Sequence, residues 1–362
     1  MDYTCRLKIL QPLDGDILNR NDGIQSNREL KLTVKGRAEP GKKIWVNGVE
    51  AKREGIHFEA QISINSHENR IVAMGEEPEV KDKITVFWDR NSVKRYRFSV
   101  DDNILFLADI ARNADVYRSI FDNPYMAMWR QMHKEFKSKI HLNIYYQTEG
   151  FNLSQMPDKF KGEWKDNADW LRLTFHALQN DPDRPYINTT YDEIKHDCQL
   201  VTDEIVRFAG EELLSTFTTV HWGEATKEGC RALRDLGFKG LVGYFNVNNQ
   251  RPLVSYYHDY DTTMHLNKRD YWKDTEEDII FVKHDIVVNS CNAHEVIPHL
   301  QEVAKDPHQS EIMELLIHEQ YFYPDYINYQ PDFKDKVETA IRWATERGYK
   351  PVFYGEGFIG SP

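Results

Sequence analysis

The chain has 362 residues, a formal net charge of −12 at pH 7 and a sequence pI near 5.6. Because this length exceeds the usual size of one domain, we expect two domains, one of them with a substantial core. Hydrophobic residues make up 40% of the chain and aromatic residues 12%, which excludes extensive disorder. The acidic balance, without a basic stripe, excludes nucleic acid as an expected partner.

The four cysteines, Cys5, Cys198, Cys230 and Cys291, lie far apart and show no CxxC spacing. We therefore expect buried free thiols rather than disulfides or a zinc knuckle. The first ten residues lack the charged segment and long apolar run of an export signal, and no apolar stretch approaches membrane-spanning length. These patterns predict a soluble, cytoplasmic protein without a membrane partner and leave its oligomeric state open.

Residues 1–93 alternate apolar and polar residues in short runs such as LKLTVKG, HFEAQISI and ITVFW. This period of two, closed each time by turn residues, predicts a small antiparallel β-sandwich. Asn47-Gly48 between two valines predicts a tight hairpin, since both residues accept positive φ angles. With its P-x-D-G, V-x-G-x-A and V-N-G motifs, the segment resembles the immunoglobulin-like modules attached to bacterial carbohydrate enzymes.

Residues 94–362 show strand-helix repeats, and their strands are apolar enough to be buried on both faces. The strands that we expect are 96–101, 140–146, 171–175, 217–220, 240–245, 279–282, 312–317 and 351–354. The helices that we expect are 124–136, 191–209, 227–236, 293–304 and 333–347. Thr226 and Asp332 stand where N-caps belong, and Gly237 and Gly348 where these helices stop. Seven or eight such units predict an α/β fold, a (β/α)7-8 barrel, although an open doubly wound sheet would give similar local patterns.

No glycine-rich phosphate motif follows any strand, which excludes nucleotide-binding sheets of the dinucleotide or P-loop kind. Polar residues stand instead directly after the apolar runs. They are Asp101-Asp102-Asn103, Gln147, His176, His221-Trp222, Asn246, Lys283-His284-Asp285, His318-Glu319-Gln320 and Glu356. Any one of them could simply be solvated. Together they predict a site, because catalytic groups of barrel enzymes lie at the carboxyl ends of the strands.

Asp101 and Asp102 would point to opposite sides of an extended strand unless the chain bends at Asn103. The two carboxylates can therefore have different roles. One can bind a cation while the other, close to that positive charge, acts as a general base on water.

From about Arg95 to Phe358 the chain resembles the NodB-type polysaccharide deacetylases, which have a distorted TIM-like barrel. Residues 99–103, SVDDN, are similar to the T-F-D-D-G motif, and His176 in LTFHA to the first histidine of the metal motif. His221-Trp222-Gly223 occupies the place of the R-x-P-x-G segment, and Leu316-Ile317-His318 resembles the late L-x-H motif. The resemblance implies that Asp101 is the general base, that Asp102 and His176 bind the metal, and that His318 is the general acid.

Two departures from the family pattern matter. The family's metal motif is H-x-x-x-H, but Asn180 stands four residues after His176. Asp181 or Asp183 could replace the missing imidazole, since zinc accepts carboxylate ligands. His221 stands in place of the motif's arginine, and we expect it to steady the oxyanion or the base. The expected metal is zinc, with nickel or cobalt as alternatives, or none at all.

Sugar rings stack on aromatic side chains. We therefore expect Trp222, Tyr321 and Tyr323 to form part of a substrate pocket, and Asp285 and Glu319 to bind substrate hydroxyls.

These residues predict a metal-dependent carbohydrate deacetylase that hydrolyses N- or O-acyl groups of a saccharide. Two alternatives remain open. One is a metal-independent glycoside hydrolase on the same barrel that uses two carboxylates such as Asp102 and Glu319. The other is a catalytically silent carbohydrate-binding protein.

Overall fold

The computed structural model describes residues 7–355 and divides them into two compact units. The first comprises residues 7–92 and 271–278, and the second comprises residues 93–270 and 279–355. The sequence placed a boundary between residues 93 and 94 but assigned the whole of 94–362 to the barrel. Cys5 and Glu356, both named above, lie outside the described residues.

The segment 271–278 belongs to the first unit because its backbone packs against the turn at Gly15. The amide of Lys273 donates to the carbonyl of Gly15 at 3.0 Å. A Cβ at Gly15, whose φ is +84°, would lie 1.9 Å from the carbonyl oxygen of Lys273, so only glycine permits this approach. A contact between such distant stretches leaves no local pattern, and the sequence therefore did not predict it.

The first unit contains two sheets. One has the order β1 (Lys8–Gln11), β4 (Leu30–Arg37), β8 (His57–Ile64), β7 (Lys52–Glu54), and β3 (Gly23–Gln25) also pairs with β4. The other has the order β2 (Ile17–Leu18), β10 (Lys81–Trp88), β9 (Glu68–Met74), β5 (Trp45–Val46), β6 (Val49–Glu50). Side chains along β4 and β8 alternate between core and surface, as the period of two predicted. The immunoglobulin-like assignment stays a prediction.

The hairpin expected at Asn47-Gly48 is confirmed. Strands β5 and β6 pair antiparallel with Val46 opposite Val49. Asn47 has φ 47° and Gly48 has φ 83°, and positive φ at both central residues is what a type I′ turn requires.

The second unit is a mixed α/β fold whose central strands run parallel. They are β11 (Arg95–Asn103), β12 (Ile140–Tyr145), β15 (Leu171–Ala177), β16 (Phe217–Thr218), β17 (Gly240–Gly243), β21 (Ile279–Lys283), β22 (Ile286–Val287) and β23 (Ile312–His318). Each expected strand from 96–101 to 312–317 has a counterpart among them. The last, expected at 351–354, is the short β24 (Lys350–Pro351), which pairs with β11.

The pairing of these strands runs in a circuit. One sheet has the order β15-β12-β11-β23-β22, and the other contains β16-β17-β21. A single bridge joins Leu173 of β15 to Leu214, three residues before β16 begins. At the other side, residues 279–287 join the two sheets, because β21 pairs with β17 while β22 pairs with β23. The strand order is therefore that of a barrel whose seam lies between β15 and β16.

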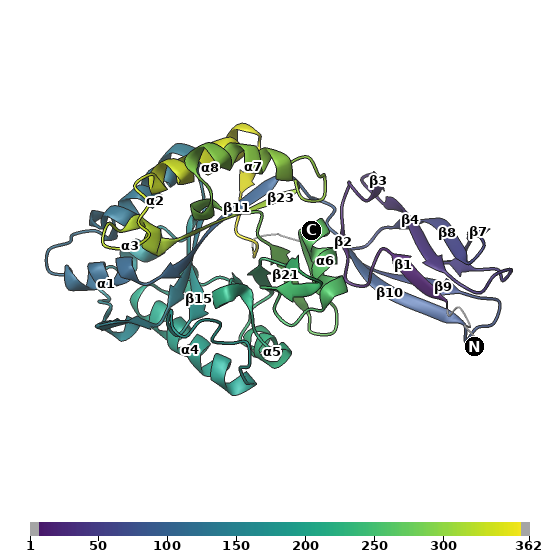
Figure 1. Cartoon of the computed structure of the whole chain (residues 1–362), viewed down its shortest axis with the longest axis horizontal. Coiled ribbons are helices and arrows are strands. Elements are labelled where there is room, and N and C mark those ends of the chain that lie inside the picture. Colours follow the sequence, from purple (N-terminus) through teal and green to yellow (C-terminus); the bar gives the residue numbers. More distant parts are fainter. Residues whose placement is uncertain (1–6, 356–362) are drawn as a thin grey trace. The chain divides into compact units, whose positions relative to one another are not determined.

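Helices surround these strands (Figure 1). They are α1 (Leu105–Arg112), α2 (Pro124–Phe136), α3 (Lys161–Asp166), α4 (Tyr191–Phe208), α5 (Lys227–Asp235), α6 (Tyr260–Arg269), α7 (Val296–Val303) and α8 (Phe333–Glu346). The sequence analysis missed α1, α3 and α6. Thr226 caps α5 as predicted, by accepting from the amide of Gly229 at 2.9 Å. Asp332 precedes α8 but makes no side-chain cap; its carboxylate pairs instead with Lys336 at 3.3 Å.

Cys198 and Cys230 are buried free thiols, as predicted, whereas Cys291 is half-buried. Among residues 7–355, no helix combines the length and the apolar character needed to cross a bilayer.

Polar side chains fill part of the barrel interior. Arg97 and Glu314 are fully buried, and an Nη1 hydrogen of Arg97 is donated to Oε1 of Glu314 at 2.7 Å. Ser99 donates to the same oxygen at 2.9 Å, and the hydroxyl of Tyr354 donates to Oε2 at 2.5 Å. The Nε of Arg97 donates to Nδ1 of His141 at 2.9 Å. This network pairs the two buried charges with each other and with neutral side chains.

We expect Arg97→Met to lower the free energy of unfolding by about 3–5 kcal/mol, because Glu314 would remain as an uncompensated buried charge. Urea unfolding monitored by circular dichroism measures this change. Arg342→Met is the control, since the exposed Arg342 pairs with Glu135 and Glu338 at the surface and should change stability little. Equal stability of Arg97→Met and the wild type would show that Glu314 needs no cation.

Candidate functional site

A β-bulge at the end of β11 shapes the site. In the pairing with β12, Val100 lies opposite Leu142 but Asn103 lies opposite Ile144, so one extra residue is inserted between them. Asp102 has φ 63°, in the left-handed region. The sequence analysis required a bend at Asn103 to bring both aspartates to one side. The bend lies at Asp102 instead, and both carboxylates line the same pocket.

Asn103 holds the bulge in place. Its Nδ2 donates to the carbonyls of Val100 at 2.6 Å and Asn143 at 3.0 Å. The hydroxyl of Tyr125 in turn donates to the Asn103 side-chain oxygen at 3.0 Å. Asn103 is therefore a structural residue that supplies the hydrogen bonds lost from the strand ladder at the bulge.

The pocket has a volume of about 540 Å³ and lies at the carboxyl ends of the strands. Its polar lining includes Asp101, Asp102, His176, His221, His284 and His318, and its aromatic lining includes Trp222, Tyr244 and Tyr321. The histidines 176, 221 and 318 and the aspartate pair, which the sequence analysis singled out, thus meet in one cavity.

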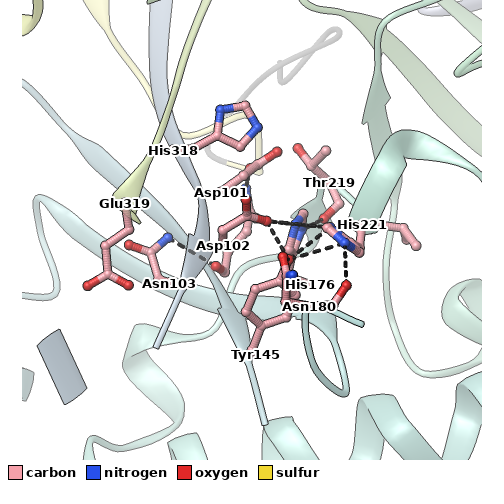
Figure 2. A network of polar contacts seen from close by, with 12 residues as sticks. Asp101, Asp102, Asn103, Tyr145, His176, Asn180, Thr219, His221, His318 and Glu319 are labelled. Atoms are coloured by element: carbon pink, nitrogen blue, oxygen red, sulfur yellow. Dashed lines mark hydrogen bonds and ion pairs between the residues drawn. The ribbon is translucent and has the colours of Figure 1, made fainter. Parts of the chain in front are cut away.

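Asp102, His176 and His221 form the centre of this pocket (Figure 2). Oδ1 of Asp102 lies 3.1 Å from Nε2 of His176 and 3.4 Å from Nδ1 of His221. The two histidine nitrogens are 3.2 Å apart. The three donor atoms therefore form a nearly equilateral triangle.

The second nitrogen of each histidine is held by a backbone carbonyl. Nδ1 of His176 lies 2.5 Å from the carbonyl oxygen of Thr219, and Nε2 of His221 lies 3.1 Å from that of Asn180. A carbonyl oxygen only accepts, so these nitrogens carry hydrogens, and in a neutral ring the opposite nitrogen presents a lone pair. Burial lowers the pKa of His176, which favours the neutral ring. Two imidazole lone pairs thus converge on the Asp102 carboxylate.

This geometry fits a divalent metal ion. Ligands at about 2.1 Å from a tetrahedral ion lie about 3.4 Å from one another, close to the three distances found. Three acceptors this close repel one another unless a hydrogen or a metal ion lies between them. Backbone carbonyls behind metal-binding histidines are also the usual means of fixing the ring orientation. His221 could therefore supply the second imidazole that the missing H-x-x-x-H spacing left unassigned.

Asp101 lies beside this cluster. It is 4% exposed, and its Oδ1 accepts a hydrogen from Nδ2 of Asn143 at 2.5 Å. Burial and the neighbouring charge of Asp102 raise the pKa of Asp101 well above its ordinary value. The residue is therefore a carboxyl group that binds a proton more readily than a solvated aspartate does.

His318 lies on the other side of Asp101 from the His176–His221 pair (Figure 2). Its Nδ1 lies 2.9 Å from the side-chain oxygen of Asn289, which leaves Nε2 for the pocket. Burial lowers the pKa of His318, and the charge of Asp102 opposes this effect.

Trp222 forms part of the pocket wall in a strained conformation. It has φ 65° and ψ 2° and is 40% exposed. The guanidinium of Arg184 lies over its ring, 5.4 Å from the centroid, and Arg184 also pairs with Glu224 at 3.6 Å. Strain of this kind persists where the surrounding structure maintains it, and it concentrates at functional sites.

Three residues expected to bind substrate do not line the pocket. The Glu319 carboxylate is fully buried and accepts from the amides of Ile104, Leu105 and Phe106 at 2.6, 2.9 and 2.7 Å. It therefore satisfies the amino end of α1, and Figure 2 shows it beyond Asn103 and away from the cluster. The hydroxyl of Tyr323 donates to Glu319 at 2.8 Å.

Asp285 is also turned away from the pocket, because its Oδ2 accepts from the amide of Glu314 at 2.8 Å. The two carboxylates proposed as replacement ligands are both exposed. Asp183 lines the pocket, Asp181 does not, and neither belongs to the metal-binding group.

Two residues of the site, Tyr145 and Asn143, were not predicted from the sequence, and Gln320 was named only as one of the strand-end residues. The hydroxyl of Tyr145 donates to Oδ1 of Asp102 at 2.5 Å, and Nε2 of Gln320 donates to Oδ2 of the same carboxylate at 2.7 Å. Asn143 contacts Asp101 as described. The sequence feature that points to a role in the site is position, since Tyr145 ends an apolar strand and Gln320 follows His318.

No family model matches the sequence, and no curated protein matches it. Several solved structures do match. A CE4 family pseudoenzyme from Bacillus anthracis aligns at 12% identity and a TM-score of 0.38, over 72% of this chain and 63% of that one, less than two thirds of its length.

A structure from Mycobacterium smegmatis, named provisionally as a polysaccharide deacetylase, aligns at 9% identity and a TM-score of 0.46, over 74% and 90%. A 4-alpha-glucanotransferase from Thermococcus litoralis aligns at 12% and 0.45, over 74% and 40%. Each of these three TM-scores is below 0.5.

We expect the protein to bind about one divalent ion per chain. Asp102→Asn and His221→Phe should each weaken Co²⁺ binding at least tenfold, because each substitution removes one of three converging donors. Isothermal titration calorimetry with CoCl₂ measures this loss. Asp181→Asn is the control, since its side chain is exposed and outside the cluster. Stronger loss in Asp181→Asn than in His221→Phe would restore the ligand set expected from the sequence.

Proposed function

We propose that the protein is a metal-dependent carbohydrate deacetylase that hydrolyses N- or O-acyl groups of a saccharide. The observation that carries this proposal is the convergence of Asp102, His176 and His221 beside a buried carboxyl group, Asp101, in one pocket. A metal site next to a separate proton acceptor is the equipment that hydrolysis of an acyl group requires.

Each residue has a position that suits one role. Asp102, His176 and His221 would hold the ion, which when bound supplies a Lewis acid for the acyl carbonyl and lowers the pKa of water. Asp101 accepts the proton of the attacking water, since its carboxylate lies next to the cluster. His318, with Nδ1 held by Asn289, presents Nε2 to the pocket; once Nε2 has taken up a proton from solvent, the imidazolium can pass that proton to the leaving amine or alkoxide. His221 is thus a ligand in this proposal and not the group that steadies the oxyanion.

The glycosidase alternative has less support. Its second carboxylate was Glu319, which caps α1 and does not line the pocket. A fully buried carboxylate with four hydrogen-bond donors is not placed to attack or protonate a glycosidic bond.

The charge of the pocket favours an uncharged acylated sugar. Its described lining contains Asp101, Asp102 and Asp183 but neither lysine nor arginine. A carboxylated, sulfated or phosphorylated sugar would meet no lysine or arginine in this described lining, since Arg184 lies over Trp222 but does not itself line the pocket. The aromatic lining offers ring faces on which a pyranose can stack.

We expect Asp101→Asn to lower acetate release by about 10² to 10⁴-fold, because the amide cannot accept the proton of water. The rate of acetate release from N-acetylated chitooligosaccharides and from acetylated xylo-oligosaccharides, with Co²⁺ or Zn²⁺ added, measures this loss. Asp158→Asn, at an exposed position outside the pocket, is the control. Full turnover in Asp101→Asn would refute the assignment of the base, and release of reducing ends in place of acetate would refute deacetylation.

We expect Trp222→Gly to weaken binding of the same oligosaccharides about tenfold without lowering the thermal midpoint. The change removes the stacking face, and glycine adopts the left-handed conformation without strain. Calorimetric titration and a thermal melt measure the two effects. Trp222→Phe should retain most of the affinity. A lower midpoint with unchanged affinity would identify Trp222 as a packing residue only.

A further inference from the structure

The hydroxyl of Tyr145 lies inside the metal-binding cluster (Figure 2). Its oxygen is 2.5 Å from Oδ1 of Asp102 and 2.9 Å from Nδ1 of His221. The ring of Tyr145 packs against those of His176 and His221, each with a centroid separation of 5.2 Å. The tyrosine is thus fixed from two sides, and its oxygen is the fourth polar atom at the centre of the site.

Hydrogen counting shows that these four atoms are short of donors. The ring hydrogens of His176 and His221 are used by the carbonyls of Thr219 and Asn180. When each ring carries only that hydrogen, the hydroxyl hydrogen of Tyr145 is the one that remains for three acceptors, Oδ1 of Asp102, Nε2 of His176 and Nδ1 of His221. This hydrogen can be donated to one acceptor at a time, and the short contact to Asp102 identifies Oδ1 of Asp102 as that acceptor. The oxygen then faces Nδ1 of His221 at 2.9 Å, and a metal ion bound by both atoms would make this contact favourable.

The distances also suit a place in a coordination shell. Two ligands of one ion, each about 2.1 Å from it, lie about 3.0–3.4 Å apart in octahedral or tetrahedral geometry. The contacts of the Tyr145 oxygen, at 2.5 and 2.9 Å, approach these values and need only a small outward movement.

We propose that the Tyr145 oxygen is a fourth protein ligand of the ion held by Asp102, His176 and His221. This inference rests on the metal site of the proposed function but not on its saccharide chemistry. Coordination as phenolate releases the hydroxyl proton to solvent, and no other bond changes. Four protein ligands fill a tetrahedral shell, so a reaction at this ion needs a fifth position for substrate.

Titration with Co²⁺ alone tests this inference. Co²⁺ should perturb the near-ultraviolet absorption of one tyrosine in the wild type. Tyr145→Phe should abolish this signal, shift the visible cobalt bands and weaken Co²⁺ binding by about 10 to 100-fold. Tyr146→Phe, which alters the neighbouring half-buried tyrosine outside the pocket lining, is the matched control and should behave as the wild type does.

Two results would overturn the inference. One is wild-type cobalt bands and affinity in Tyr145→Phe. The other is weaker binding in Tyr145→Phe when the wild type shows no tyrosine perturbation, which would reduce Tyr145 to a hydrogen-bond donor that positions Asp102. The wild-type difference spectrum gives a result even if Tyr145→Phe fails to fold. The cobalt titration does not measure acetate release, so a negative result for Tyr145 leaves the deacetylase proposal standing. Conversely, a protein that shows the tyrosine signal but releases no acetate would refute deacetylation alone.

Discussion

The left-handed backbone of Asp102 is the constraint on which the rest of the site depends. In a regular strand the carboxylates of Asp101 and Asp102 would lie on opposite faces, and only one would reach the pocket. The bulge turns both toward it. A non-glycine residue in this conformation costs about 1–3 kcal/mol, although aspartate tolerates it better than most residues do. Asn103 offsets this cost by bonding the carbonyls of Val100 and Asn143.

The polar interior of the barrel continues from the bulge toward the other end of the strands. Asn143 connects Asp101 to Thr218, whose hydroxyl donates to the Asn143 side-chain oxygen at 3.3 Å. Ser99, two residues before Asp101, donates to Glu314 in the buried ion pair with Arg97. A buried ion pair stabilises a fold only weakly, but removing one partner is costly because the other remains as an unpaired buried charge. The network therefore restricts how β11 and β23 can pair and, through them, where the site residues stand.

Sequence reasoning predicted the regular parts well because their signals are local. Apolar runs marked the parallel strands, and the residue set around His176, His221 and His318 followed from their position at strand ends. It failed where the cause is distant in sequence. Helix α1 follows β11 almost directly, and no residue before it makes a side-chain cap. The cap is Glu319, more than two hundred residues away. The same contact explains why Glu319, a promising carboxylate by position, does not line the pocket.

The ligand set shows the same limit from another side. A spacing such as H-x-x-x-H describes positions within one loop, whereas metal binding depends only on where the donor atoms lie in space. The sequence analysis looked for the missing imidazole near Asn180, in the loop after His176. In the structure that loop contributes a backbone carbonyl that orients His221, which arrives from the next strand end. A barrel brings the ends of neighbouring strands together, so a ligand can come from an adjacent strand while the distances among the donors are kept. A departure from a family's spacing is therefore weak grounds for inferring a lost metal site.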